Sequence, residues 1–209
     1  MRLLLALLAL VLLPAAAAKA QPVSVTVQRD GDAFTADFIF PRAAPAWGFY
    51  RSSPDAESKR SWRLLSWRVL TPGVVLQRRG SYDALVSTTG RPVPPKVRVR
   101  FSPFTVDLVA DYVPALRLGG NSVAIFDGHF AVFSVVRPDI LDRLSPSGDP
   151  RLVTDTGTSI RFRGNNLRLA GDVDGYRRGD SEGTYGLYDV PRAVVRNSVA
   201  TVLDADLPK

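Results

Sequence analysis

The stretch VSVTVQRDGDAFTADFIF, residues 23–40, contains two runs in which every second residue is apolar. A period of two is typical of β-strands that have one buried face. The dipeptide Asp30-Gly31 between the two runs is a signal for a tight turn. The stretch therefore predicts that the folded chain opens with a β-hairpin.

Further segments share this character: they are short, rich in β-branched or aromatic residues, and bounded by Gly, Pro, Asn or Asp. They are residues 62–70, 74–77, 83–86, 97–101, 106–110, 123–126, 130–136, 160–162 and 167–169. Sixteen prolines and sixteen glycines are spread along the chain and leave room for helix only at 139–144 and 191–203. Many short strands and little helix predict an all-β fold, an antiparallel β-sandwich.

The first twenty residues have the pattern of a secretory signal peptide. Arg2 is followed by an apolar run from Leu3 to Leu13 and by the small-residue sequence Ala18-Lys19-Ala20. The apolar run is too short to cross a bilayer as a permanent helix. We therefore expect a signal peptide at 1–20 and a secreted or periplasmic β-sandwich domain at 21–209, with no membrane span after cleavage.

Composition adds two expectations about the chain of 209 residues as a whole. It contains no cysteine, which excludes disulfides and thiolate metal sites. Only four of its 27 basic residues are lysines, an arginine bias that indicates a GC-rich bacterial genome. Residues 145–157 are rich in Ser, Pro, Gly, Asp and Thr, and form either a long loop or a boundary between two sheets.

The segment SVAIFDGHFAVFSVV, residues 122–136, predicts a second hairpin with Asp127-Gly128 in its turn. Both faces of that hairpin would be apolar, whereas an antiparallel sheet that faces solvent is polar on one side. Two explanations are open. The hairpin lies centrally in the sandwich under a loop or helix, or another domain or subunit packs on it.

His129 is the only histidine, so catalysis by a Ser-His-Asp arrangement, by a zinc site with paired histidines or by an imidazole base would depend on it. The chain contains neither a GxSxG nor an HExxH motif. We interpret His129 as a structural residue and predict a non-catalytic protein without a cofactor.

The segment GDVDGYRRGDSEGTYG, residues 171–186, offers weak candidates for calcium ligands: Asp172, Asp174, Asp180 and Glu182. Tyr176 stands where an EF-hand loop requires Asp or Asn, and Arg177 and Arg178 repel a cation. A solvated turn is the alternative to a metal site. Paired carboxylates of the glycosidase kind cannot be picked out by spacing.

Basic residues alternate with apolar ones in KVRVRF (96–101) and IRFR (160–163). Each strand therefore has one basic face, which makes Arg98, Arg100, Arg161 and Arg163 candidates for binding an anionic ligand. The alternative is a solvated sheet face. The chain has no glycine-rich phosphate loop, and an exported protein is not expected to bind nucleic acid.

The segment FPRAAPAWGFYRSSPD, residues 40–55, holds Trp47 and Tyr50 among three prolines. Prolines keep such a segment stiff, so these rings are placed to stack on a sugar or a peptide at little entropic cost. The alternative is that they fold inward and cap the edge of the sandwich. The direction of Trp47 decides between the two.

Four stretches, FTADFIFPRAAPAWGFYRS, WRLLSWRVLTPGVVLQ, SYDALVS and the segment 96–133, resemble the N-terminal β-domain of PDZ-bearing glycyl aminopeptidases and related gluzincin metallopeptidases. The matching elements of the family's proline, tryptophan, glycine and tyrosine corner are Pro41, Pro45, Trp47, Gly48 and Tyr50. The chain departs from that corner because no proline precedes Gly48 and Phe49 separates Gly48 from Tyr50.

The resemblance implies an accessory domain beside a peptidase domain. That family's catalysis uses an HExxH helix that this chain lacks, so no catalytic residue is carried over. The chain ends in LDADLPK as if a downstream domain had been lost or were encoded separately, and exposed Phe126 or Phe133 would fit such a partner.

Three functions follow as expectations. The first is an exported, non-catalytic β-sandwich protein that acts by protein or substrate interaction. The second is a periplasmic binding module for a glycan or another anionic envelope ligand, using Trp47, Tyr50 and the four arginines. The third is a hydrolase with a carboxylate-based site.

Overall fold

The molecule is built from β-strands and three short helical elements in residues 21–145, 152–170 and 185–189, the part of the chain that this computed structural model describes. The strands are β1 (Val23–Asp30), β2 (Ala33–Ile39), β3 (Ala46–Phe49), β4 (Trp67–Val69), β5 (Val74–Arg79), β6 (Tyr82–Ser87), β7 (Lys96–Phe101), β8 (Ala115–Arg117), β9 (Val123–Phe126), β10 (Val132–Val135), β11 (Val153–Thr154), β12 (Thr158–Arg163), β13 (Leu167–Ala170) and β14 (Tyr185–Tyr188). The helical elements are α2 (Trp62–Ser66), the 3-10 turn η1 (Asp127–Phe130) and α3 (Ile140–Arg143).

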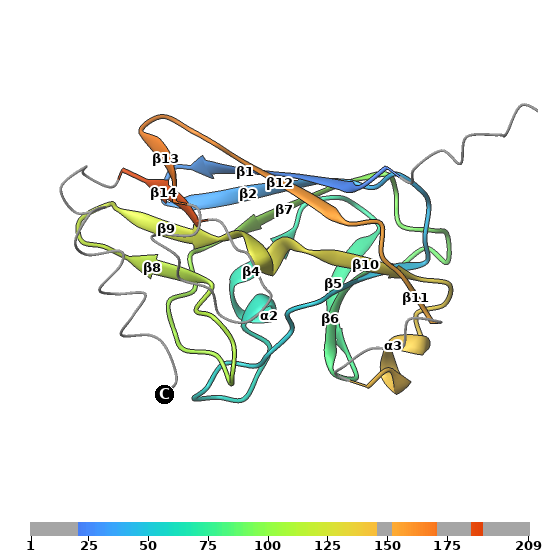
Figure 1. The fold of residues 1–209 in the computed structure, drawn as a ribbon. Coiled ribbons are helices and arrows are strands. Elements are labelled where there is room, and N and C mark those ends of the chain that lie inside the picture. Colours follow the sequence, from blue (N-terminus) through green and yellow to red (C-terminus); the bar gives the residue numbers. More distant parts are fainter. Residues whose placement is uncertain (1–20, 146–151, 171–184, 190–209) are drawn as a thin grey trace, which may run out of the picture.

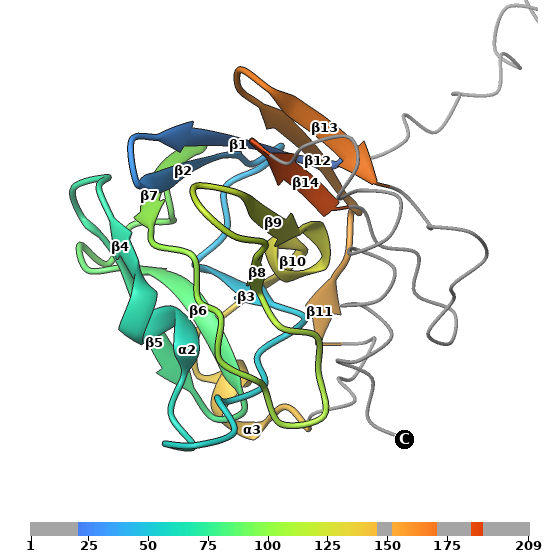
Figure 2. The same ribbon diagram turned by 90° about the vertical axis from the view of Figure 1, so that its left-hand side faces the viewer.

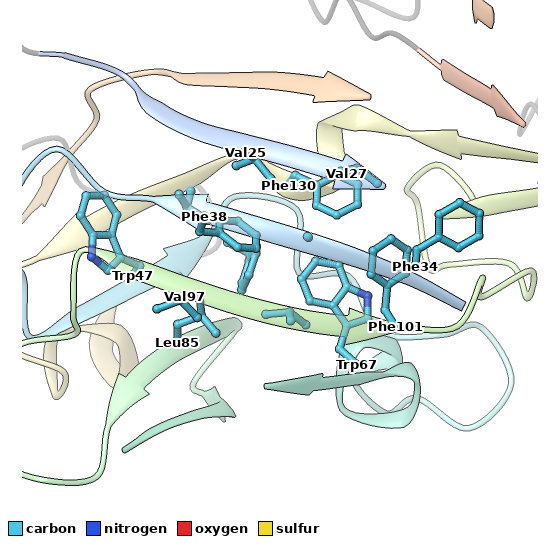
Figure 3. Packing of buried hydrophobic residues seen from close by; sticks show 14 of the residues in the cluster. Val25, Val27, Phe34, Phe38, Trp47, Trp67, Leu85, Val97, Phe101 and Phe130 are labelled. Atoms are coloured by element: carbon cyan, nitrogen blue, oxygen red, sulfur yellow. The ribbon is translucent and has the colours of Figure 1, made fainter. Parts of the chain in front are cut away.

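The strands form three sheets that enclose one main core. Sheet I has the order β12-β1-β2-β7-β4, sheet II the order β11-β10-β3-β6-β5, and sheet III the order β13-β14-β9-β8. In Figure 1, β12, β1, β2 and β7 of sheet I form an upper layer, with sheet II and strands β8 and β9 of sheet III beneath it; β13 and β14 of sheet III lie at the level of β1 or above it (Figures 1 and 2). Apolar side chains from all three sheets meet in the main core, among them Phe38 and Phe101 of sheet I, Leu85 of sheet II and Ile125 of sheet III (Figure 3 shows a part of this packing). The predicted all-β sandwich is confirmed.

The predicted opening hairpin is also confirmed. β1 and β2 pair antiparallel from Ser24 opposite Ile39 to Asp30 opposite Ala33. Gly31 lies in the connecting turn with a φ of 62°, a conformation that glycine adopts without steric cost. One pairing departs from the antiparallel prediction, because β12 joins the other side of β1 in parallel.

Residues 62–70 and 106–110, predicted as strands, differ in the structure. The first begins with helix α2, capped by the Ser61 hydroxyl, which accepts a hydrogen bond from the Leu64 amide at 3.3 Å. Of the predicted strand, only the three residues of β4, which follow α2, pair in sheet I. In residues 106–110, Leu108 makes only isolated bridges, and Ala110 has a φ of 53°, which interrupts an extended strand.

The predicted hairpin at residues 122–136 is wrong. Asp127-Gly128 belongs to η1, which carries the chain from β9 in sheet III to β10 in sheet II. The Phe126 ring packs on Gly128, where a Cβ would lie 2.5 Å from the ring. η1 therefore leads the chain from sheet III into sheet II and does not bring β9 and β10 side by side.

Burial on both sides nevertheless explains why both faces of β9 and of β10 are apolar. One face of β10 belongs to the main core, and Phe133 on its other face packs on Tyr82 and beside Leu141 of α3. Phe126 of β9 packs against Tyr112 and against Tyr185 of β14. Phe126 and Phe133 are both buried, so neither gives the exposed surface that a missing partner domain would leave.

The proline-rich segment 40–55, read from sequence as a loop, contributes the central strand β3 to sheet II. The predicted helix at 139–144 is confirmed as α3, while 191–203 lies outside the described residues. Of 145–157, the described part contains β11, which pairs with β10. Among the described residues, no helix has the length and apolar composition that crossing a membrane requires.

Candidate functional site

The outer face of sheet I is the surface on which the four arginines predicted from sequence gather. Strand alternation turns the buried residues of β1, β2 and β7 into the core and their neighbours outward. The outward side chains that we name the basic face are Ser24, Thr26, Gln28, Asp30, Thr35, Asp37, Ile39, Arg68, Lys96, Arg98, Arg100, Ser159, Arg161 and Arg163.

The strand register arranges these side chains in rows that run across the sheet. The first row is Arg163, Gln28, Thr35, Arg100 and Arg68, contributed by β12, β1, β2, β7 and β4 in that order. The second row is Arg161, Thr26, Asp37 and Arg98, on the first four of those strands. The four predicted arginines therefore share one face, with β1 and β2 between the two pairs.

The basic face carries six basic and two acidic side chains, a net charge of +4. Arg98 forms a bidentate pair with Asp37, with N–O distances of 2.5 and 2.8 Å, and this pairing raises the pKa of Arg98. Arg100 lies 3.4 Å from Asp30. In the described part of the chain, no carboxylate lies within ion-pair distance of Arg68, Lys96, Arg161 or Arg163.

A groove of about 520 Å³ opens at one end of the basic face, between β2, β7 and the chain that follows β4. Lys96, Arg98 and Asp37 supply its charges, and Ile39 and Leu70 are its exposed apolar residues. The groove extends the face toward a partly apolar edge.

The structure separates Trp47 and Tyr50 from the arginines. Trp47 is fully buried and stacks on Phe40 with ring centroids 4.3 Å apart, so its ring is not available to a ligand. The inward direction of Trp47, one of the two alternatives from sequence, is the one observed. Tyr50 is 42% exposed but lies on the α3 side of sheet II, against Phe133. Burial and a hydrogen bond to Asp155 raise the pKa of Tyr50.

A buried charge cluster that the sequence did not reveal lies beneath β5 and β6. The guanidinium of Arg63, with no exposed surface, donates to the Asp83 carboxylate at 3.1 Å and to the His129 carbonyl at 2.7 Å. It also lies over the rings of Phe49 and Trp62, at 4.3 and 4.5 Å. Burial lowers the pKa of Arg63 to about 10, and the charge of Asp83 opposes that shift, so the group is charged at neutral pH.

Asp83 is also completely buried and accepts a second charged hydrogen bond, from Arg78 at 3.0 Å. Its backbone amide donates to the Ser52 hydroxyl at 3.0 Å. Every partner of this carboxylate is a fixed donor within the fold. The cluster is therefore a structural clamp between α2, β5, β6 and η1, closed to an external substrate.

His129 lies beside this clamp and is 1% exposed. Its Nε2 is 2.8 Å from the Tyr112 carbonyl oxygen, and its ring contacts Trp62 edge to face. Burial, assisted by the charge of Arg63, lowers the pKa of His129 to about 3. The imidazole is therefore neutral across the physiological range and donates from Nε2 to Tyr112.

This shift predicts a pH dependence of stability. In the unfolded chain a histidine binds a proton below about pH 6.5, while folded His129 stays neutral down to about pH 3. The contribution of His129 to stability is thus constant above about pH 7 and falls as the pH drops from about 6.5 toward 3. Between pH 7 and pH 5 the wild-type protein should lose about 2 kcal/mol more unfolding free energy than His129→Gln. Urea denaturation at both pH values measures this; equal losses in the two proteins would contradict the assignment.

The remaining candidates from the sequence are the calcium ligands and a pair of carboxylates. Asp172, Asp174, Asp180 and Glu182 lie outside the described residues, and within those residues no cluster of three His, Asp or Glu side chains could hold a metal ion. A second, internal cavity of about 10 Å³ is lined mainly by aromatic side chains and His129. Neither this cavity nor the groove brings two carboxylates together, as glycoside hydrolysis requires.

No protein-family model, curated protein or solved structure matches this chain.

Proposed function

We propose that this protein is an exported binding module for anionic ligands and that the basic face of sheet I is its binding surface. The supporting observation is the assembly of Arg98, Arg100, Arg161 and Arg163, from two segments distant in sequence, on one exposed and nearly uninterrupted sheet face. Guanidinium groups bind carboxylates and phosphates through two parallel hydrogen bonds and remain charged at any physiological pH.

The charge distribution favours ligand binding over a purely solvated surface. A solvated sheet face is commonly balanced by mixed charges. Here Arg98 and Arg100 have carboxylate neighbours, whereas Arg161 and Arg163 have none within ion-pair distance among the described residues. An anionic ligand would satisfy these donors and lower the repulsion between them.

The test compares two variants with the same change in charge. Arg100→Gln, Arg161→Gln and Arg163→Gln together remove three of the six basic side chains of the basic face. Arg117→Gln, Arg137→Gln and Arg143→Gln remove three exposed arginines from β8 and from the region of α3. Affinity for polygalacturonate, measured by titration calorimetry at low salt, should fall between about tenfold and a hundredfold in the first variant only. Equal affinities in the two variants would rule out the basic face.

A further inference from the structure

We infer that the ligand is a linear acidic polysaccharide that lies across the strands, along the first row of the basic face. This inference rests on the proposed function and adds the ligand class and its direction. It follows from the order in which charged and neutral polar side chains occur along that row.

The first row is a continuous track. Arg163, Gln28, Thr35, Arg100 and Arg68 face each other on five neighbouring strands. Adjacent strands are about 4.8 Å apart, so the track is about 19 Å long. The step from strand to strand is close to the rise of one sugar unit in an extended polysaccharide. Successive units of such a chain can therefore meet successive side chains.

The chemistry along the track changes with position. Arg163 at one end and Arg68 at the other are suited to carboxylates, and Arg100 beside Arg68 keeps further N–H donors for a ligand although Asp30 lies 3.4 Å from its Nη1. Gln28 and Thr35 between them offer an amide and a hydroxyl, which can donate to and accept from sugar hydroxyls. Polyphosphate has no hydroxyl groups for these two side chains. A ligand with carboxylates and hydroxyls on one chain uses all five positions.

The second row is less suited to an anion. Asp37 lies in its centre and occupies Arg98 through two hydrogen bonds. A polyanion bound along the second row would be repelled by the carboxylate of Asp37, which lies between Arg161 and the already paired Arg98. Asp37 therefore confines the ligand to the first row.

An anionic membrane surface fits the basic face less well than a polysaccharide. Interfacial binding needs apolar side chains that insert between the lipids. On the basic face Ile39 is the one large apolar residue, and it lies outside both rows. Thr26, Gln28 and Thr35 occupy the middle of the surface instead.

The experiment measures the affinity of the purified protein for oligogalacturonates of increasing length, for polyphosphate and for phosphatidylglycerol vesicles at low salt. Oligogalacturonate affinity should rise steeply until the oligomer spans the track and then level off. Arg163→Gln and Arg68→Gln should each lower the affinity for long oligomers by about tenfold, whereas Arg117→Gln on sheet III should change that affinity little. Gln28→Ala and Thr35→Val should weaken oligogalacturonates several-fold and leave polyphosphate binding unchanged. Asp37→Asn should strengthen the binding of both polymers.

The outcomes separate this inference from the proposed function. If none of the three ligands binds better to the wild-type protein than to the variant without Arg100, Arg161 and Arg163, the proposed function itself is wrong. If polyanions bind but affinity is independent of length, or Arg163→Gln and Arg68→Gln act no more strongly than Arg117→Gln, the track is wrong. If vesicles or polyphosphate bind more tightly than oligogalacturonates of equal charge, the ligand class is wrong.

Discussion

Replacing Asp83 with alanine should lower the free energy of unfolding by about 3–5 kcal/mol, the cost of leaving a buried charge without its partner. Arg63 has no exposed surface, and Asp83 is its only carboxylate partner within ion-pair distance among the described residues. Without that carboxylate the guanidinium keeps only the His129 carbonyl and the aromatic rings around it. Urea denaturation followed by tryptophan fluorescence measures the loss.

Two controls make the Asp83 prediction specific. Asp142→Ala breaks the pair between Arg79 and Asp142, in which both side chains are partly exposed, and should cost less than about 1 kcal/mol. The double variant Arg63→Met with Asp83→Leu removes both charges, so its loss should be smaller than the sum of the single losses. A loss for Asp83→Ala that is no larger than that for Asp142→Ala would show that the buried clamp does not stabilise the fold.

Replacing Trp47 with alanine should also cost about 3–5 kcal/mol, for a different physical reason. The indole is fully buried on a central strand and stacks on Phe40 at an interplanar angle of 12°. Its removal leaves a cavity in the main core that the surrounding strands cannot close.

Trp47→Phe should lose less than Trp47→Ala, because an aromatic ring still fills part of the space. Val136→Ala, directly after β10, removes a side chain that is 70% exposed and should change stability by less than about 0.5 kcal/mol. Thermal melts of the three variants provide the comparison. A Trp47→Ala protein as stable as Val136→Ala would place the indole at the surface.

The sequence patterns that predicted elements correctly are those set by local alternation. β1, β2 and β7 have one face in the core and one in solvent, and each was predicted within three residues of its bounds. The segment at 62–70 failed because its alternating apolar residues serve two elements: Trp62 packs from helix α2 and Trp67 from strand β4. Strand β3 was missed because Pro41 and Pro45 precede it and Gly48 lies within it, and strands seldom contain proline or glycine.

The candidate site could be predicted only in part. Alternation identified Arg98 and Arg100 as one set and Arg161 and Arg163 as another. It could not show that β12 pairs in parallel with β1, because residues as distant in sequence as Val23 and Thr158 become neighbours only in the folded chain. The places of Gln28, Thr35 and Arg68 in the first row depend on the other pairings of sheet I. The buried pair of Arg63 and Asp83 gave no sequence signal, because charged residues in strands and helices are usually exposed.

The buried residues that stabilise the fold and the surface proposed to bind anionic ligands lie in different parts of the molecule. Trp47, Arg63 and Asp83 lie on the inner side of the sandwich, while the basic face occupies the outer side of sheet I. Substitutions on the basic face should therefore change binding without unfolding the protein. This separation is what makes the binding variants interpretable.

The salt dependence of polygalacturonate affinity tests the central claim most directly. Binding that depends on arginine contacts to a polyanion releases counterions. The logarithm of the affinity therefore falls linearly with the logarithm of the salt concentration, and the slope is proportional to the number of contacts. Between about 50 and 200 mM salt the wild-type protein should lose at least about tenfold in affinity. The variant lacking Arg100, Arg161 and Arg163 should show a clearly shallower slope, and the variant lacking Arg117, Arg137 and Arg143 the wild-type slope. Equal slopes in all three proteins would contradict the proposal that the basic face binds anionic ligands.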